Sequence, residues 1–249
     1  MTKLKLILSV LVFAIFSTSF STAVLAATSD SITVYSTRKE HLIKPLFDAF
    51  TSNTGIEVKY LTGNGGALIE RIKLEGKRTK ADMFITVDAG NLWYAASQNL
   101  FQQVKSEIIN NNIPDHLRDP EGFWTGLSVR ARTIIYSTER VDPSELSTYQ
   151  DLADKKWKGR LCLRTSKKVY TKSLVASLIY HDGQKTTTDV VKGWVDNLAA
   201  TPNAEDNHVM SAILAGQCDV GIVNTYYFGR LQAEKPNVAL KLFWANQGS

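Results

Sequence analysis

Strand-like and helix-like segments alternate near the start of the chain, and this alternation constrains the fold more than any other feature. The apolar runs of strand length are residues 31–36, 56–61 and 81–87. Apolar residues at helical spacing mark the segments between them, residues 41–54 and 67–74. Because strands separated by helices pair in parallel, the sequence predicts an α/β fold with a parallel sheet and helices on both faces.

The second half of the chain repeats the alternation after a loose region, residues 105–122, that contains several asparagines and prolines. We expect a long strand at residues 124–137 to cross into a second lobe and a final strand at residues 238–244 to cross back. Between them, the expected strands are residues 159–164 and 220–223, and the expected helices are residues 146–152, 166–180, 188–198 and 207–214. The predicted lobes are therefore residues 27–131 and residues 132–249.

The first 26 residues have the organisation of a secretory signal peptide. Lys3 and Lys5 form a basic start. An apolar core, residues 6–16, precedes a small-residue cleavage site at residues 24–26. The core is shorter than the ~20 residues of a membrane-spanning helix, so we expect cleavage of residues 1–26 and export to the periplasm. The alternative is an uncleaved N-terminal anchor.

The charge balance gives little support to a nucleic-acid partner. The formal net charge of the 249 residues is +5, and loss of Lys3 and Lys5 with the signal peptide lowers it to +3. No basic run with interleaved aromatic residues accompanies this mild excess, so we expect no nucleic-acid binding and a basic cleft suited to an anion. The sequence also lacks the Gly-x-Ser-x-Gly, His-Glu-x-x-His and paired cysteine–histidine signatures, so we expect no enzyme activity.

Two cysteines, Cys162 and Cys218, remain in the expected exported chain. An even count outside the cytoplasm predicts one disulfide, here between two expected strands of the second lobe. Such a bridge closes a long loop and contributes about 4 kcal/mol to stability. The alternative is a pair of buried free thiols.

Adjacent tyrosines, Tyr226 and Tyr227, follow the buried strand that ends near Asn224. On a strand their side chains would point to opposite faces, whereas a turn into a helix would let both phenols face one cleft. Open α/β sheets bind ligands at the carboxyl ends of their strands, and phenolate oxygens suit a hard, highly charged cation. The pair therefore predicts a metal site, and the alternative is a pair of ordinary core or rim aromatic residues.

Several short segments carry a resemblance to one family over residues 31–244. They are Ile32-Thr33-Val34-Tyr35-Ser36-Thr37-Arg38, Ala81-Asp82-Met83-Phe84, Val87-Asp88-Ala89-Gly90-Asn91-Leu92-Trp93, Arg130-Ala131-Arg132, Trp157-Lys158-Gly159-Arg160 and Asn224-Thr225-Tyr226-Tyr227. Together they resemble the periplasmic ferric-iron-binding proteins of ABC iron importers, in their tyrosine-rich subtype. The resemblance implies a type II periplasmic-binding-protein fold, in which two lobes with mostly parallel sheets and flanking helices are hinged by crossing strands. It also implies Fe³⁺ as the ligand, a monomer, and delivery to an inner-membrane ABC permease with its ATPase.

The resemblance further implies that Tyr170, Tyr226 and Tyr227 bind the iron. Tyr170 matches a third tyrosine that the subtype carries at the start of a second-lobe helix. A free phenol has a pKa near ~10, and a trivalent cation lowers that pKa by stabilising the phenolate. Three phenolates would neutralise the charge of Fe³⁺.

The first lobe departs from the family pattern. Many relatives place histidine, or histidine and tyrosine, directly after the arginine that corresponds to Arg38, where this chain has Lys39 and Glu40. Other relatives have a glutamate where this chain has Val87. We therefore expect no iron ligand from the first lobe, and we expect His41 to be a surface residue.

Three tyrosines leave an octahedral ion short of donors, and the resemblance implies that water or an exogenous anion such as carbonate completes the site. Arg38 and Arg130 are the expected partners of this anion, with Ser166 at a helix N-terminus, where backbone N–H groups favour negative charge. Arg230, one turn past Tyr227, is expected to hold a tyrosinate by a charge-assisted hydrogen bond. The alternative for each arginine is a surface or inter-lobe salt bridge.

The expected function is therefore the binding of ferric iron in the cleft between the lobes, for iron uptake. The alternative is a two-lobed ABC solute-binding protein for another ligand, either a polyamine or an oxyanion such as a phosphonate. A polyamine site should be rich in carboxylates, so the tyrosines favour iron. The chain stops soon after the expected return strand, so we also expect the complete protein to continue beyond residue 249.

Overall fold

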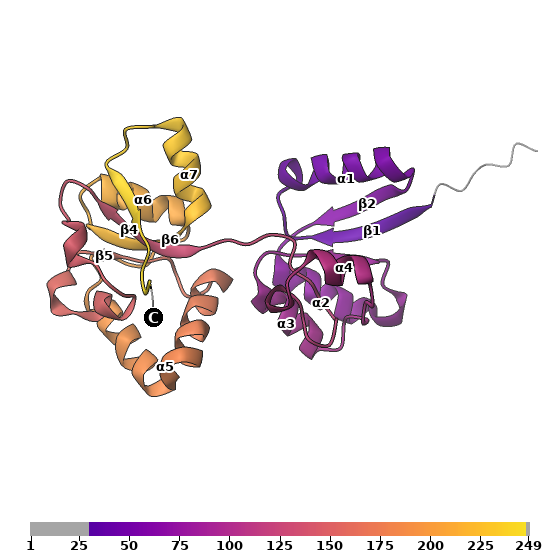
Figure 1. Ribbon diagram of the computed structural model, residues 1–249, viewed down its shortest axis with the longest axis horizontal. Coiled ribbons are helices and arrows are strands. Elements are labelled where there is room, and N and C mark those ends of the chain that lie inside the picture. Colours follow the sequence, from indigo (N-terminus) through magenta and orange to yellow (C-terminus); the bar gives the residue numbers. More distant parts are fainter. Residues whose placement is uncertain (1–29, 248–249) are drawn as a thin grey trace, which may run out of the picture.

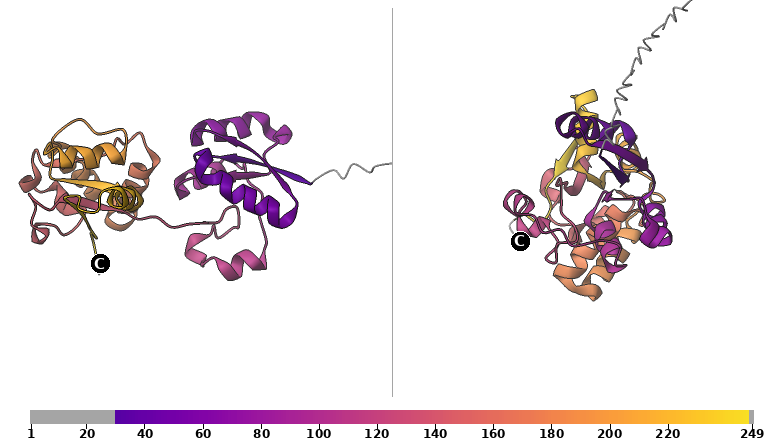
Figure 2. Two further views of the ribbon diagram at one scale, coloured as in Figure 1. Left: turned by 90° about the horizontal axis from the view of Figure 1, so that it is seen from above. Right: turned by 90° about the vertical axis from the view of Figure 1, so that its right-hand side faces the viewer.

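The computed structural model describes residues 30–247 of the 249-residue chain. Its elements form two groups, here called the first and second lobes, joined by an extended segment, as Figure 1 and the left view of Figure 2 show. The predicted signal peptide, residues 1–26, lies outside the described residues. Within them, no helix combines the length and the apolar character that crossing a membrane requires.

The first lobe contains a three-stranded parallel sheet with the order β2-β1-β3. Its strands are β1 (Ser31–Ser36), β2 (Glu57–Thr62) and β3 (Met83–Ile85). The helices that follow them are α1 (Glu40–Thr54), α2 (Gly65–Glu75), α3 (Ala89–Ser97) and α4 (Glu107–Asn112), with 3-10 turns at Gly76–Arg78 and Asp115–Leu117. Helix α1 ends at Gly55, whose φ of 75° lies in the left-handed region that favours glycine.

Helices cover both faces of this sheet because neighbouring residues of β1 point in opposite directions. Val34 packs with Ile43 and Phe47 of α1. The next residue, Tyr35, packs with Leu68 of α2. The predicted parallel sheet with helices on both faces is confirmed.

The second lobe contains a four-stranded sheet with the order β5-β6-β4-β7. Its strands are β4 (Arg132–Ser137), β5 (Leu161–Cys162), β6 (Val220–Asn224) and β7 (Leu240–Phe243). Strands β5, β6 and β7 share one direction, and β4 runs opposite to them. The helices are α5 (Val169–Asp196), α6 (Asp206–Leu214) and α7 (Thr225–Glu234), with 3-10 turns at Pro143–Glu145, Gln150–Ala153 and Lys155–Trp157. The 3-10 turns stand in place of the helix predicted at residues 146–152.

The segments expected to cross between the lobes differ from the prediction. Only the second half of the expected strand 124–137 joins a sheet, as β4. The residues just before β4 form the extended segment that connects the two lobes in Figure 1, and they pair with neither sheet. The expected return strand is β7. It pairs antiparallel with β4 and lies at the edge of the second sheet, so it belongs to the second lobe.

Helix α5 takes the place of the two helices predicted at residues 166–180 and 188–198. It spans Val169–Asp196 and contains a break at Gly183, whose φ of 82° and ψ of 160° are not helical. Figure 1 shows the two arms that result. Glycine adopts this φ without the strain that a side chain would add, so the two predicted helices meet there without a loop between them.

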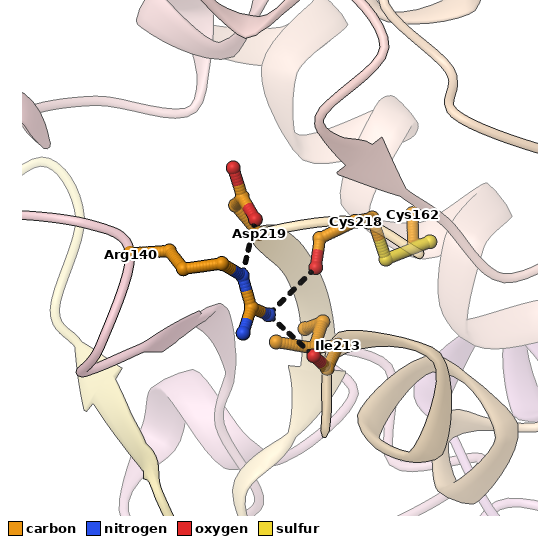
Figure 3. The surroundings of a disulfide bond; sticks show 5 residues. All are labelled: Arg140, Cys162, Ile213, Cys218 and Asp219. Atoms are coloured by element: carbon orange, nitrogen blue, oxygen red, sulfur yellow. Dashed lines mark hydrogen bonds and ion pairs between the residues drawn. A yellow bond between two sulfur atoms is a disulfide. The ribbon is translucent and has the colours of Figure 1, made fainter. Parts of the chain in front are cut away.

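A disulfide joins Cys162 in β5 to Cys218 just before β6, with their Cα atoms 5.9 Å apart. The predicted pairing is confirmed. Figure 3 shows Arg140 beside it, donating hydrogen bonds to the carbonyl groups of Ile213 and Cys218 and to the carboxylate of Asp219. The bridge and this arginine anchor the start of β6, the strand that leads to the tyrosine pair.

Candidate metal centre

The turn from β6 into α7 brings Tyr226 and Tyr227 side by side. Strand β6 ends at Asn224 and α7 begins at Thr225, so both tyrosines lie in the first turn of a helix and not on opposite faces of a strand. Their ring centroids are 4.3 Å apart, with an angle of 34° between the ring planes. Of the two arrangements that the sequence left open, the structure therefore has the turn from strand into helix.

Tyr170 joins this pair from a separate segment. It is the second residue of α5. Burial, together with the neighbouring Tyr226 phenol, raises the pKa of Tyr170 to about 12. Burial and a hydrogen bond with Tyr226 also raise the pKa of Tyr227. Tyr170 and Tyr227 are therefore neutral at pH 7, and a cation that binds their oxygens must displace their protons.

Two of the predicted arginines contact these rings. Arg130, just before β4, donates a hydrogen bond from Nη1 to the Tyr170 hydroxyl at 3.2 Å. Its guanidinium carbon is 5.7 Å from the ring centroids of both Tyr170 and Tyr226. The guanidinium carbon of Arg230, on α7, lies 5.1 Å from the ring centroid of Tyr226 and 5.4 Å from that of Tyr227. Positive charge therefore faces the aromatic cluster from two segments.

Arg164 is a further arginine at the cluster, and the sequence analysis did not single it out. It follows β5, is only 7% exposed, and has its guanidinium carbon 5.1 Å from the Tyr170 ring centroid. The position of Arg164 at the end of a predicted strand could have identified it. Because β5 and β6 are parallel neighbours, their carboxyl ends meet at one edge of the sheet. Arg164 follows β5 at this edge, as the tyrosine pair follows β6.

Arg38 and Ser166 are the other two predicted anion partners. Arg38 lies between β1 and α1, where its backbone N–H donates to the Ser36 hydroxyl. Its side chain makes no hydrogen bond or ring contact with the three tyrosines in the described part of the chain. Ser166 precedes α5, whose N-cap is Lys168, so its expected place at the helix N-terminus is corrected. The helix begins late because the Lys168 N–H donates to the carbonyl of Thr165 and closes a turn there.

The first lobe contacts the second lobe close to Tyr170. Ser173, one turn along α5, donates a hydrogen bond of 2.6 Å to Asp88 Oδ1. The same oxygen accepts from the Gly90 N–H at 2.9 Å, so Asp88 caps α3. The φ of Asp88 is 73°, a left-handed conformation that is uncommon for a residue with a side chain. Asp88 therefore links a strained loop of the first lobe to the helix that carries Tyr170.

Glu40 and His41, the first-lobe residues near Arg38, do not contact the tyrosine cluster among the described residues. Glu40 accepts a hydrogen bond of 2.8 Å from the Tyr60 hydroxyl, and His41 is exposed on α1. Across residues 30–247, no group of three or more histidine, cysteine, aspartate or glutamate side chains could hold a metal ion. The tyrosine cluster is therefore the candidate metal centre, with oxygen donors that suit a hard cation.

Comparison with known proteins identifies the family of the chain. Residues 78–249 match a family model described as bacterial extracellular solute-binding protein. Iron uptake protein A1 of Synechocystis sp. is 45% identical over 206 residues, which are 82% of this chain and 57% of that protein. Iron uptake protein A2 of the same organism is 42% identical over 230 residues, 90% of this chain and 65% of that protein. The chain thus spans less than two thirds of the length of these two relatives.

Solved structures show the same architecture. A structure of Trichodesmium FutA (IdiA) in complex with iron and citrate ligands has a TM-score of 0.82 and 43% identity, covering 88% of this chain and 71% of that one. The ferric binding protein from Campylobacter jejuni has a TM-score of 0.80 and 34% identity, covering 87% and 71%. The predicted type II periplasmic-binding-protein fold is confirmed by these likenesses. The chain belongs to the family of bacterial extracellular solute-binding proteins.

Proposed function

We propose that this protein binds Fe³⁺ through Tyr170, Tyr226 and Tyr227 and serves iron uptake. The observation that carries the proposal is a cluster of three phenols from two separate segments, with arginine side chains beside it. Phenolate oxygens suit a hard trivalent cation, and three of them balance its charge. The names of the relatives, an iron uptake protein and a ferric binding protein, support the same ligand.

An exogenous anion or water completes the coordination of the iron in this proposal. Arg130 suits the anion because its guanidinium lies beside two of the tyrosines and has five N–H donors, more than its bond to Tyr170 uses. Carbonate is the anion that we propose, and citrate accompanies iron in the Trichodesmium structure. Arg38 and Ser166 stay predictions as anion partners, and Arg230 holds the tyrosine pair from α7.

The family to which the chain belongs supports the transport role that we propose. Residues 27–131 and 132–249 act as the two lobes, and removal of residues 1–26 releases the protein into the periplasm. The monomer then delivers iron to an inner-membrane ABC permease, whose ATPase drives import, and performs no enzymatic step itself. Release of the iron follows its reduction or the protonation of the tyrosinates, since both weaken the bond between metal and phenolate.

Single tyrosine-to-phenylalanine variants test the ligand set. Changing Tyr170, Tyr226 or Tyr227 to phenylalanine removes one charged donor and keeps the ring. Each change should lower Fe³⁺ affinity, measured by competition with a chelator, by more than the roughly 10–100-fold that loss of an outer partner costs. Tyr180→Phe is the matched control, because Tyr180 lies on the same helix as Tyr170 and is 85% exposed. Wild-type affinity in Tyr170→Phe would contradict the proposed ligands.

The arginines around the cluster favour a second candidate, an oxyanion-binding protein. Arg130, Arg164 and Arg230 all lie against the tyrosine rings. A putative 2-aminoethylphosphonate-binding periplasmic protein of Salmonella typhi is 25% identical over 199 residues, 80% of this chain and 56% of that protein. Calorimetric titration with a phosphonate, in the absence of iron, separates the candidates. Tight phosphonate binding together with weak Fe³⁺ binding would favour the second one.

A further inference from the structure

A fully buried carboxylate lies behind the tyrosine cluster. Asp206, the first residue of α6, is 0% exposed. Arg132 Nη1 donates to its two oxygens at 3.0 and 3.2 Å, and the Asn224 backbone N–H donates to Oδ2 at 3.0 Å. Arg164 Nη1 lies 3.5 Å from Oδ1. A buried charge is costly without such partners, so this network fixes where Asp206 and both arginines lie.

Arg132 connects Asp206 to the segment that carries the tyrosine pair. Its Nη2 donates to the carbonyl of Ile222 at 3.0 Å, and its Nη1 donates to Asn224 Oδ1 at 3.2 Å. Asn224 is the last residue of β6, and its Nδ2 donates to the Tyr226 hydroxyl at 3.4 Å. The buried ion pair therefore holds the strand end from which the tyrosine pair projects.

Arg164 connects the same carboxylate to the segment that carries Tyr170. Its Nε donates to the carbonyl of Ala204 at 3.2 Å, and its guanidinium carbon lies 5.1 Å from the Tyr170 ring centroid. The Thr171 hydroxyl donates to the carbonyl of Arg164 at 3.4 Å, which ties the start of α5 to the same residue. Both segments with proposed iron ligands are thus connected to Asp206.

We propose that Asp206 is a positioning residue for the iron site. Through Arg132 and Arg164, this one carboxylate sets the position of Tyr170 relative to the tyrosine pair. The inference rests on the proposed iron function. A metal site is tight only when its donors are held close to their bound geometry by the residues behind them, and loss of such a partner costs about 10–100-fold in metal affinity.

Asp219 offers a matched control at the opposite end of β6. It too bridges two arginines, accepting from Arg140 Nε at 2.7 Å and from Arg160 Nε at 2.6 Å, and Figure 3 shows the first of these bonds. It directly precedes β6, so it lies roughly 16 Å along the strand from Asn224, the residue that ends β6 before the tyrosine pair. Loss of either carboxylate should lower the melting temperature, but only loss of Asp206 should alter the iron site.

Substitutions that remove the charge test the inference. Asp206→Asn should weaken Fe³⁺ binding about 10–100-fold and shift the visible tyrosinate–iron band, whereas Asp219→Asn should leave affinity and band at wild-type values. Arg164→Gln keeps the ion pair between Arg132 and Asp206, so this variant should fold. It should shift the visible band in the same way, and it tests the inference if Asp206→Asn does not fold. A wild-type band and affinity in either folded variant, or equal losses in Asp219→Asn, would overturn the inference.

Iron-free crystal structures separate failure of this inference from failure of the iron function. In Asp206→Asn or Arg164→Gln, the Tyr170 ring should move away from the Tyr226 phenol whether or not iron binds. Unchanged ring positions would refute the positioning role. If the wild-type protein binds no Fe³⁺, the proposed function is refuted. The position of the Tyr170 ring in the iron-free variants would still test whether Asp206 is a positioning residue.

Discussion

Iron binding should release protons, and the tyrosine cluster determines how many. Burial and the Tyr226 phenol raise the pKa of Tyr170 to about 12, and burial together with Tyr226 raises the pKa of Tyr227. Each of these two phenols is neutral at pH 7, so each must lose one proton when its oxygen binds Fe³⁺. We therefore expect Tyr170→Phe to release about one proton fewer per iron than the wild-type protein.

The direction of the pH dependence follows from the raised pKa values. Protons compete with Fe³⁺ for the phenol oxygens at every pH below the raised pKa, so affinity falls as the pH falls and rises as the pH rises. Each phenol that loses a proton contributes about a factor of ten in affinity per pH unit. The slope of log affinity against pH should therefore be smaller by about one in Tyr170→Phe than in the wild type.

Calorimetry in buffers of different ionisation enthalpy measures the protons released per iron. Ferric nitrilotriacetate serves as the iron source for every protein, so protons that belong to the chelator cancel in the difference. Tyr180→Phe, at an 85% exposed position of α5, should match the wild type. Equal proton release from the wild type and Tyr170→Phe would refute the reasoning, because it would mean that iron displaces no proton from Tyr170.

Three further predictions concern stability and the contact between the lobes. Replacing Cys162 and Cys218 with serine should lower the free energy of unfolding by about 4 kcal/mol in guanidinium denaturation, and an unchanged value would contradict a stabilising role for the bridge. Gly221→Ala should destabilise the second lobe by about 1–3 kcal/mol, because the added Cβ would lie 2.8 Å from the carbonyl oxygen of Cys162; a wild-type melting temperature would count against this packing. Ser173→Ala removes the hydrogen bond that links α5 to Asp88 of the first lobe, so iron should leave faster in stopped-flow measurements with an unchanged visible band. An unchanged rate would contradict a role of this bond in holding the two lobes together around the iron.

Local signals were sufficient to predict much of the fold. In the first lobe, apolar strands alternate with helices, and Gly55 ends the first helix in the left-handed conformation that glycine favours. Before the tyrosine pair, the continuous apolar run predicted a buried strand, and β6 lies there. In both places the deciding information lies within a few neighbouring residues.

Other features depend on contacts between distant segments, which periodicity does not encode. The pattern of residues 124–131 is typical of a strand, but whether such a segment pairs depends on the presence of a neighbouring strand. Gly183 indicates a break between helices, yet only its observed backbone angles show that no loop intervenes. Asp206 has the sequence context of an exposed residue at a helix start, and its burial follows from Arg132 and Arg164, which come from other elements.

The visible absorption spectrum of the purified protein during titration with ferric iron tests the central claim most directly. The proposed ligands are phenolates, and a tyrosinate bound to Fe³⁺ absorbs visible light. We expect a band that grows until about one iron is bound per chain, as three phenolates at one site imply, and that disappears when dithionite and a chelator are added. Iron bound tightly without a visible band, or a band that persists when Tyr226 and Tyr227 are both changed to phenylalanine, would contradict the account.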